Sequence, residues 1–145
     1  MSEATTSRRD LARKFIEALP HCRALAMSVE DVGDGEAVME LPYAENLVGD
    51  PATGVIHGGA VSALMDTCGG TAVMAHPSGP AMTATLDLRI DYMRAATPGK
   101  TVTAKAVCYH MTRSVAFVRA IAHDGDESDP VATAAGAFTV QGTSQ

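Results

Sequence analysis

Tryptophan is absent from the 145-residue sequence, and the other large aromatic residues are few, with three phenylalanines and three tyrosines. Basic residues are also scarce, since eleven Lys and Arg against seventeen Asp and Glu leave a formal net charge of −6. Nucleic-acid binding uses cations to neutralise phosphates and aromatic rings to stack on bases. The composition therefore predicts that this protein has no nucleic-acid partner.

Long apolar runs and cysteine pairs are missing as well. No uninterrupted apolar stretch approaches the roughly 20 residues that span a bilayer, so no membrane contact is expected. Arg8-Arg9 precedes Asp10 instead of an apolar segment, which argues against a secretory or twin-arginine signal. The cysteines are Cys22, Cys68 and Cys108. Their odd number and wide spacing indicate buried free thiols in a reducing cytoplasm, with no disulfide framework, metal site or cofactor.

The composition that is present, 46% hydrophobic and 19% charged, is typical of one compact domain over residues 1–145. Within it, residues 1–23 are predicted to form an N-terminal helical extension and residues 141–145 a tail. The apolar residues of 8–19 recur at helical spacing. We therefore expect an amphipathic helix there that stops at Pro20.

A β-hairpin is predicted next, because residues 24–32 and 36–41 flank Gly33-Asp34-Gly35 and the second run alternates between apolar and polar side chains. Residues 43–56 carry the Asn, Gly, Asp and Pro residues of a loop.

The run from residue 58 to residue 75 is predicted to be a buried helix, because it is long, small and aliphatic. Its Gly69-Gly70 pair costs about 1 kcal/mol per glycine relative to alanine, which a close backbone contact would offset. Asp66 is the only formally charged side chain between residues 51 and 86. A carboxylate in such surroundings calls for a specific role.

Four strand-like runs follow the helix, at residues 85–92, 101–109, 114–123 and 131–140. Strict alternation in the first run places Thr85 beside Asp87 and away from Leu86. Because the connections are short, we expect the four runs to pair as an antiparallel meander. These elements predict an α+β fold in which the sheet wraps around the central helix.

Basic residues are absent between residues 24 and 88, whereas residues 89–119 contain six of them and a single acidic residue. Such a block is either the solvated face of amphipathic strands or a surface for a polyanionic small molecule.

Two features of residues 57–66 suggest chemistry. Gly58 and Gly59 follow His57 where the loop becomes the helix, so unpaired N–H groups there suit a carbonyl oxygen that gains negative charge. The alternative is a tight helix entry capped by His57. Asp66 is a candidate general base, or else a hydrogen-bonded structural carboxylate. Eight helical residues separate Gly58 from Asp66 by about 12 Å, so a site that uses both needs two chains in a symmetric dimer with composite sites.

Three features occur together: Asn46, the motif HGGAVSALMD at residues 57–66, and a strand that ends in Asp91-Tyr92-Met93. With this combination, residues 36–140 resemble the acyl-CoA thioesterases of the hotdog fold, of the phenylacetate-degradation (PaaI-like) type. The resemblance implies a single hotdog domain, an antiparallel sheet wrapped around a long central helix. It also implies hydrolysis of an acyl-CoA thioester to free acid and CoA, by a homodimer that pairs into a homotetramer.

The resemblance further implies roles for individual residues. The Gly58 N–H and Asn46 would polarise the thioester carbonyl. Asp66 would activate the attacking water or attack directly, and Thr85 would bind that water. His57 would hold the carbonyl-binding loop and assist the leaving thiolate.

Substrate-binding roles are expected for Gly59, Met65, Arg94, Lys100, Arg113 and Ser114. Methionine walls accept acyl groups of several shapes, and Met65 and Met82 would line the acyl pocket. The basic side chains would meet the phosphates of CoA.

Two other functions stay open as alternatives. A non-catalytic acyl-CoA-binding or sensing module would use the same pocket without turnover. A hotdog hydratase or dehydratase is disfavoured, because no histidine lies within five residues of Asp66 and the central helix contains no glutamate. A serine hydrolase is disfavoured because Ser62 lies within the helix, outside any GxSxG elbow.

Overall fold

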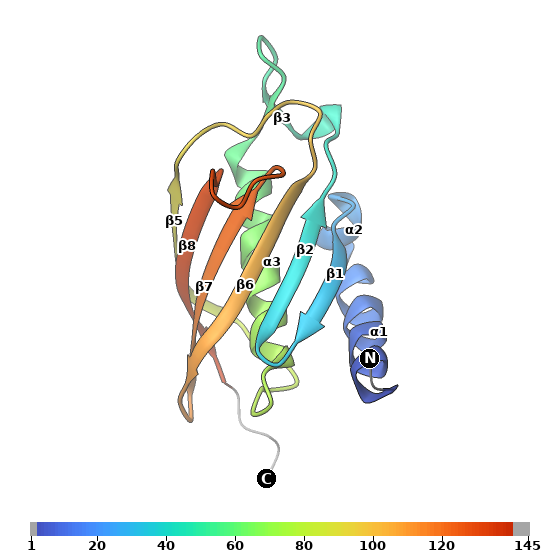
Figure 1. Ribbon diagram of the computed structural model, residues 1–145, viewed down its shortest axis with the longest axis vertical. Coiled ribbons are helices and arrows are strands. Elements are labelled where there is room, and N and C mark those ends of the chain that lie inside the picture. Colours follow the sequence, from blue (N-terminus) through green and yellow to red (C-terminus); the bar gives the residue numbers. More distant parts are fainter. Residues whose placement is uncertain (1–2, 141–145) are drawn as a thin grey trace.

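A long central helix, α3 (Gly58–Ala75), packs against one face of a six-stranded antiparallel sheet in the computed structural model (Figure 1). The structure describes residues 3–140, and the tail predicted at residues 141–145 lies outside them. The strands of this sheet are β1 (Ser28–Gly33), β2 (Glu36–Leu41), β5 (Thr85–Tyr92), β6 (Val102–Met111), β7 (Val115–His123) and β8 (Ala132–Thr139). The predicted α+β fold, with its sheet around a central helix, is confirmed. Within residues 3–140, no helix is long and apolar enough to cross a membrane.

The order of the strands differs from the predicted meander. It runs β1-β2-β6-β7-β8-β5, so β6 pairs with β2 while β5 pairs with β8 at the edge. The prediction assumed that short connections join neighbouring strands, but residues 93–101 are long enough to cross one end of the sheet (Figure 1). The Met93 N–H donates to the Val131 carbonyl oxygen at 2.8 Å, which anchors the start of this crossing beside β8.

Two helices precede the sheet, α1 (Glu3–Glu17) and α2 (Pro20–Ala24). Pro20 was expected only to stop a helix, but it also begins α2, because proline at the first helical position loses no hydrogen bond. α1 packs against β1, where Arg13 Nε donates to the Val29 carbonyl oxygen at 2.8 Å and Ile16 is buried. The helical extension therefore lies along one edge of the sheet.

The predicted loop at residues 43–56 contains short regular elements: a 3₁₀ helix η1 (Glu45–Leu47) and a two-stranded ribbon of β3 (Val48–Asp50) and β4 (Val55–Ile56). This ribbon folds onto the start of α3. The His57 N–H donates to the Leu47 carbonyl oxygen at 2.7 Å. A Cβ at Gly49 would lie 2.8 Å from the His57 Cα, so only glycine permits this approach.

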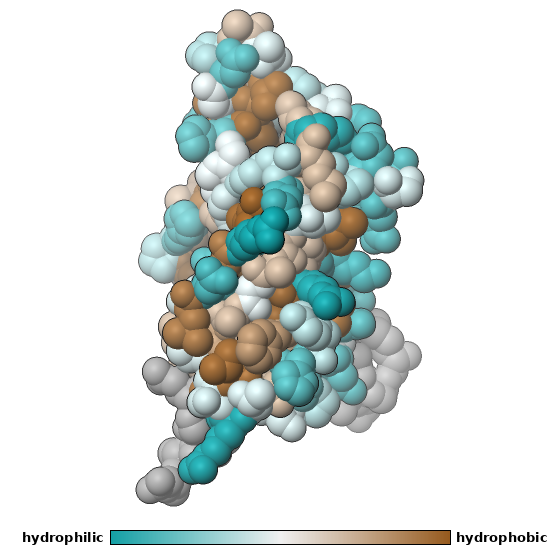
Figure 2. All heavy atoms as spheres, turned by 90° about the vertical axis from the view of Figure 1, so that its left-hand side faces the viewer, coloured by the Kyte–Doolittle hydropathy of each residue, from teal (hydrophilic) through white to brown (hydrophobic). Residues whose placement is uncertain are grey.

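The edge strand β5 carries a β-bulge at its start. Thr85 pairs with Phe138 but Asp87 already pairs with Ala137, so Leu86 is the extra residue. The bulge reverses the expected alternation and turns Thr85 toward the helix, on the side of buried Phe138. Along this edge the exposed large hydrophobic side chains are Met82, Leu86, Tyr92 and Met93. Figure 2 views the molecule from the β5 side and shows hydrophobic patches between polar side chains.

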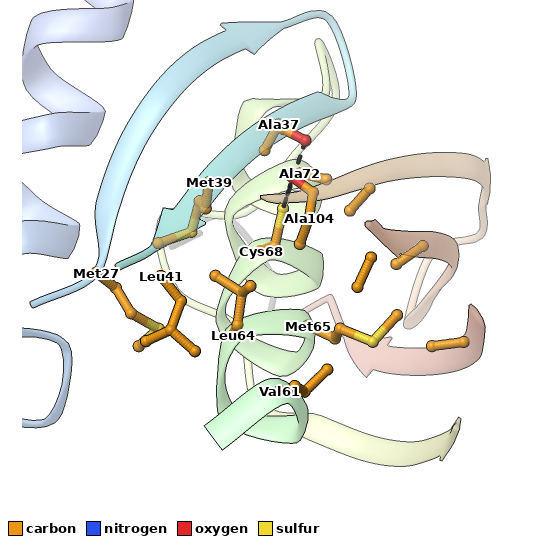
Figure 3. Close-up of a cluster of buried hydrophobic side chains, with 14 of the residues drawn as sticks. Met27, Ala37, Met39, Leu41, Val61, Leu64, Met65, Cys68, Ala72 and Ala104 are labelled. Carbon is orange, nitrogen blue, oxygen red and sulfur yellow. Dashed lines mark hydrogen bonds between the residues drawn. The ribbon is translucent and has the colours of Figure 1, made fainter. Parts of the chain in front are cut away.

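The core lies between α3 and the sheet. Figure 3 shows Val61, Leu64, Met65, Cys68 and Ala72 on the helix, extending toward the strands, and all five are buried. The Cys68 thiol donates to the Ala37 carbonyl oxygen at 3.4 Å, and burial raises its pKa to about 12. Cys68 is therefore an inert thiol, and all three cysteines are buried and free, as predicted.

Small side chains let the helix approach the sheet closely. The buried alanines of the strands are Ala37, Ala104, Ala106, Ala116, Ala120, Ala122, Ala132 and Ala134. On the helix, a Cβ at Gly69 would lie only 2.9 Å from the Cζ of Phe138. The ring therefore contacts the backbone of α3, and this packing offsets the helix propensity lost at Gly69.

Candidate active site

The N-terminus of α3 is capped by His57. Its Nδ1 accepts a hydrogen bond from the Gly59 N–H at 2.8 Å. This bond corrects the expectation that Gly59 binds substrate through its N–H, because that donor is already engaged within the chain. The Gly58 N–H has no acceptor among the described residues. It therefore points a free donor out of the positive end of the helix dipole.

Two hydroxyl groups brace the first residue of the helix, and sequence reasoning missed both. Tyr92 donates to the Gly58 carbonyl oxygen at 2.7 Å and Ser62 donates to the same oxygen at 3.2 Å. The hydroxyls of Ser62 and Tyr92 also contact each other. The i, i+4 spacing of Gly58 and Ser62 was a usable signal, whereas the position of Tyr92 depends on where the edge strand lies.

Asn46 lies at the same end of α3. It belongs to η1, next to Leu47, whose carbonyl oxygen accepts the His57 N–H. Its side chain is exposed. The fold therefore ties the segment of Asn46 to the helix N-terminus.

Asp66 and Thr85 form a hydrogen-bonded pair. The Thr85 hydroxyl donates to Asp66 Oδ1 at 2.5 Å, from β5 to the middle of α3. Strict alternation placed Thr85 on the opposite face of its strand, and this expectation is wrong because the bulge at Leu86 shifts the register. The second carboxylate oxygen of Asp66 has no donor within residues 9–140, so it is free to accept one.

A cavity of about 190 Å³ opens beside this pair, with Asp66 and Thr85 in its wall. The rest of the lining is mostly apolar and includes Met82 and Phe138. Met82 was expected in an acyl pocket and does line this cavity. Met65 does not, because it faces the sheet and is fully buried in the core (Figure 3).

A second cavity of about 300 Å³ lies at the helix N-terminus, where Gly58, Tyr92 and Val131 are among its lining residues. It shares no residue with the cavity of Asp66. Both residues lie on the single helix α3, so the estimated separation of about 12 Å applies. Within one chain, the free N–H of Gly58 and the carboxylate of Asp66 therefore belong to two different hollows.

The basic residues do not form one cluster. Arg94 makes a bidentate pair with Asp124 at 2.7 and 3.0 Å and a further ion pair with Asp129 at 3.3 Å. These bonds hold the pKa of Asp124 below its usual range and raise that of Arg94. Arg94 thus fastens residues 93–97 to the β7–β8 loop, and it also lines the cavity at the helix N-terminus. Its expected contact with CoA phosphates stays a prediction.

Lys100, Arg113 and Ser114 are exposed. Lys100 precedes β6, whereas Arg113 and Ser114 form the turn after it, so the length of the strand separates them (Figure 1). The Ser114 carbonyl oxygen accepts the Val140 N–H at 2.9 Å. Residues 9–140 hold no group of three or more His, Cys, Asp or Glu side chains that could bind a metal ion.

Comparisons with known proteins agree with this geometry. A family model described as thioesterase superfamily matches residues 53–131. A Halobacterium salinarum protein named as an esterase is 37% identical over 122 residues, which are 80% of this chain and 81% of that protein. A solved structure from Pseudomonas aeruginosa has 40% identity and a TM-score of 0.82 and covers 92% of this chain and 99% of that chain. The solved structure of a mutant of the phenylacetic acid degradation protein PaaI of Thermus thermophilus has 29% identity and a TM-score of 0.74. It covers 85% of this chain and 100% of that chain.

A long helix wrapped by an antiparallel sheet, with one carboxylate on its open flank, is the architecture of a hotdog-fold protein. The chain belongs to the thioesterase superfamily, and its general reaction is thioester hydrolysis. Its likeness to PaaI confirms the predicted resemblance to PaaI-like hotdog thioesterases.

Proposed function

We propose that this protein hydrolyses acyl-CoA thioesters to the free acid and CoA. The observation that carries the proposal is the Asp66–Thr85 pair in the wall of a largely apolar cavity. A carboxylate with one oxygen free can accept a proton from water, and apolar walls suit an acyl group beside it.

Asp66 acts as the general base in this proposal. Its free oxygen takes a proton from a water molecule, and the resulting hydroxide forms a C–O bond with the thioester carbonyl carbon. The C–S bond then breaks, and the proton held by Asp66 returns to the leaving thiolate, so that water has been added across the bond. Thr85 keeps the carboxylate oriented and leaves one oxygen for the water.

The carbonyl oxygen is polarised at the other element of the site, the N-terminus of α3. The unpaired Gly58 N–H and the helix dipole stabilise the negative charge that develops on this oxygen. Asn46 supplies a second donor from η1. His57 holds the loop through its bond to Gly59. Because its Nδ1 accepts, the neutral ring carries its proton on Nε2 and can hydrogen-bond to the sulfur of the leaving thiolate without transferring that proton.

Two chains are needed to bring these elements to one thioester, and we propose a homodimer with two composite sites. Each site takes the helix N-terminus from one chain and Asp66 from the other. β5 offers an unpaired strand edge, and the side chains of Leu86 on the strand and of Met93 just after it are exposed. Pairing of two such edges would satisfy the free backbone groups and cover these hydrophobic side chains. The outer face of the sheet, where Phe117 and Ile121 are partly exposed, is available for two dimers to form a homotetramer.

The nucleotide of CoA requires cations, and Lys100 and Arg113 are the two candidates with exposed side chains. Ser114 lies beside Arg113 and can add a hydroxyl donor. We also propose a cytoplasmic location, and the three free cysteines, which suit a reducing compartment, support it.

Release of free thiol from a panel of acyl-CoA esters tests the proposed function. Aryl-acetyl, aroyl and straight-chain esters are each mixed with the protein and a disulfide reagent that reports thiol. Turnover of any ester supports the proposal and identifies the preferred acyl group. Tight binding without thiol release would instead favour a sensing module, and water addition to an enoyl ester without thiol release would favour a hydratase.

Complementation tests the composite site. An Asp66→Asn chain is mixed with a Gly58→Pro chain, which lacks the donor N–H. In a heterodimer, one composite site contains both substitutions, whereas the other takes an unchanged helix N-terminus from one chain and an unchanged Asp66 from the other. Activity should therefore return to the mixture. Verified heterodimers that show no turnover would argue for a site within one chain while leaving the hydrolysis itself in place.

A further inference from the structure

The cavity of Asp66 and Thr85 is closed on one side by the N-terminal extension. Phe15 and Ile16 of α1, with Leu19 just after it, line the same cavity of about 190 Å³ as the catalytic pair. The match to the thioesterase family spans only residues 53–131. These three side chains, called here the N-terminal wall, therefore lie outside the segment that the family model matches.

The exposure of the wall suggests that a ligand covers it. Ile16 is 3% exposed and anchors α1, whereas Phe15 and Leu19 keep 42% and 37% of their surface accessible. Met82, across the cavity, is 58% exposed. Apolar side chains on both sides of a hollow favour an apolar occupant, and each methylene buried there strengthens binding roughly fourfold.

We propose that the N-terminal wall sets the size of the acyl group that reaches Asp66, with Phe15 as the main specificity-determining residue. This inference rests on the proposed hydrolysis of acyl thioesters. The volume of the cavity equals that of roughly six water molecules in the liquid, so one ring or a short aliphatic chain fills it.

The wall is attached independently of the cavity. Arg13 Nε donates to the Val29 carbonyl oxygen at 2.8 Å, and the Val29 N–H donates to Glu17 Oε1 at 3.3 Å. These bonds hold α1 on β1 through residues that do not line the cavity. Shortening the Phe15 side chain should therefore widen the cavity without releasing the helix.

Gly70 offers the opposite change on the facing wall. A Cβ at Gly70 would lie 3.5 Å from Thr83 Cγ2 and 3.8 Å from Phe138 Cε2, both ordinary contact distances. Thr83 and Phe138 also line the cavity, so the methyl group of Gly70→Ala occupies part of it without a clash. The chain thus provides one substitution that enlarges the cavity and one that reduces it.

The test compares kcat/KM for decanoyl-CoA with that for butanoyl-CoA. Phe15→Ala should raise the ratio of long to short substrate about tenfold or more, and Gly70→Ala should lower it in the same range. Leu11→Ala is the matched control, because Leu11 lies on the same helix but lines only the neighbouring cavity, and it should leave the ratio unchanged.

A second readout does not depend on turnover. The sequence has no tryptophan, so Phe15→Trp introduces a single tryptophan into the wall, whose emission can be excited apart from that of the tyrosines. Binding of the non-hydrolysable thioether S-decyl-CoA should shift its emission to the blue, while Leu11→Trp should not respond.

The outcomes separate this inference from the function on which it rests. In one outcome the wild type hydrolyses thioesters, while Phe15→Ala and Gly70→Ala leave the substrate ratio unchanged and the tryptophan at position 15 does not respond to S-decyl-CoA. This result overturns only the proposed role of the N-terminal wall in substrate selection. Failure of the wild type to hydrolyse any thioester overturns the proposed function, and with it the proposed role of the N-terminal wall in substrate selection.

Discussion

The two flanks of α3 have opposite characters. The flank that faces the sheet carries Leu64, Met65 and Cys68, each fully buried. The open flank carries Asp66 and Gly70, which face a cavity and the N-terminal wall. Neighbouring residues in the sequence thus fall into a rigid apolar core and a partly open polar site.

The difference shows how one helix can serve stability and chemistry at once. Buried positions are fixed by close packing, so a change in side-chain volume there lowers the free energy of unfolding. Positions on the open flank make few packing contacts, so a substitution there alters chemistry or substrate choice with little effect on the fold. The following substitutions test this division, in order of decreasing expected effect.

Asp66→Asn should give the largest effect. It preserves the shape of the side chain and removes the base, so kcat should fall by roughly 10² to 10⁴-fold while substrate still binds. Steady-state thiol release measures the change. Asp87→Asn, on the outer face of β5, is the control and should retain wild-type kcat. Retention of more than half the activity in Asp66→Asn would show that another group activates the water.

Met65→Ala and Met82→Ala form a matched pair for the two sides of the site. Met65 is fully buried, so its truncation should cost about 2–5 kcal/mol in the free energy of unfolding and leave KM near the wild-type value. Met82 is 58% exposed and lines the cavity, so its truncation should change KM and hardly affect stability. Urea unfolding and steady-state kinetics on both variants give the comparison, and a reversed pattern would place Met65 in the acyl pocket.

Gly69→Ala and Gly70→Ala should change stability in opposite directions. A methyl group at position 69 meets the Phe138 ring at 2.9 Å, and such overpacking typically costs about 1–3 kcal/mol. A methyl group at position 70 meets no atom closer than 3.5 Å, so the better helix propensity of alanine should stabilise the protein by up to about 1 kcal/mol. Thermal unfolding of the two variants decides the sign, and equal shifts would show that Phe138 yields to the added methyl.

Asp124→Asn tests the ion pair that holds the crossing segment 93–101. Arg94 holds the pKa of Asp124 below its usual value of 3.8, so the charged carboxylate stabilises the fold above that pH and loses this contribution as the pH falls toward the lowered pKa. The variant should have a lower free energy of unfolding than the wild type at pH 7. This difference between the two proteins should become smaller below pH 3.8. Urea midpoints between pH 7 and pH 3 measure it. A gap that does not depend on pH would assign the loss to packing instead.

Local patterns in the sequence were sufficient to predict several elements. The aliphatic run at 58–75 matches α3, and Asp66 was found as the one charge in an apolar stretch. The two short runs on either side of Gly33-Asp34-Gly35 also pair as predicted. These features depend on side chains a few residues apart, where period and turn chemistry determine the conformation.

Contacts between distant residues escaped such patterns. The place of β5 next to β8 and the bulge at Leu86 depend on which strand edges are free once β6 has paired with β2. Arg94 was expected at a phosphate because its charge is visible in the sequence, whereas its partner Asp124 lies thirty residues away along the chain. Tyr92 was overlooked for the same reason, since its bond to Gly58 exists only because β5 ends beside the helix N-terminus.

The sequence by itself determined that this protein has one long apolar helix with a single carboxylate and a glycine-rich start, because helical period and composition are local properties. Only the tertiary structure decided that Thr85 reaches Asp66, that Met65 belongs to the core, and that α1 closes the cavity. The physical reason is that strand register and packing minimise a free energy summed over the whole chain, in which the residue opposite a given side chain is set by every other pairing.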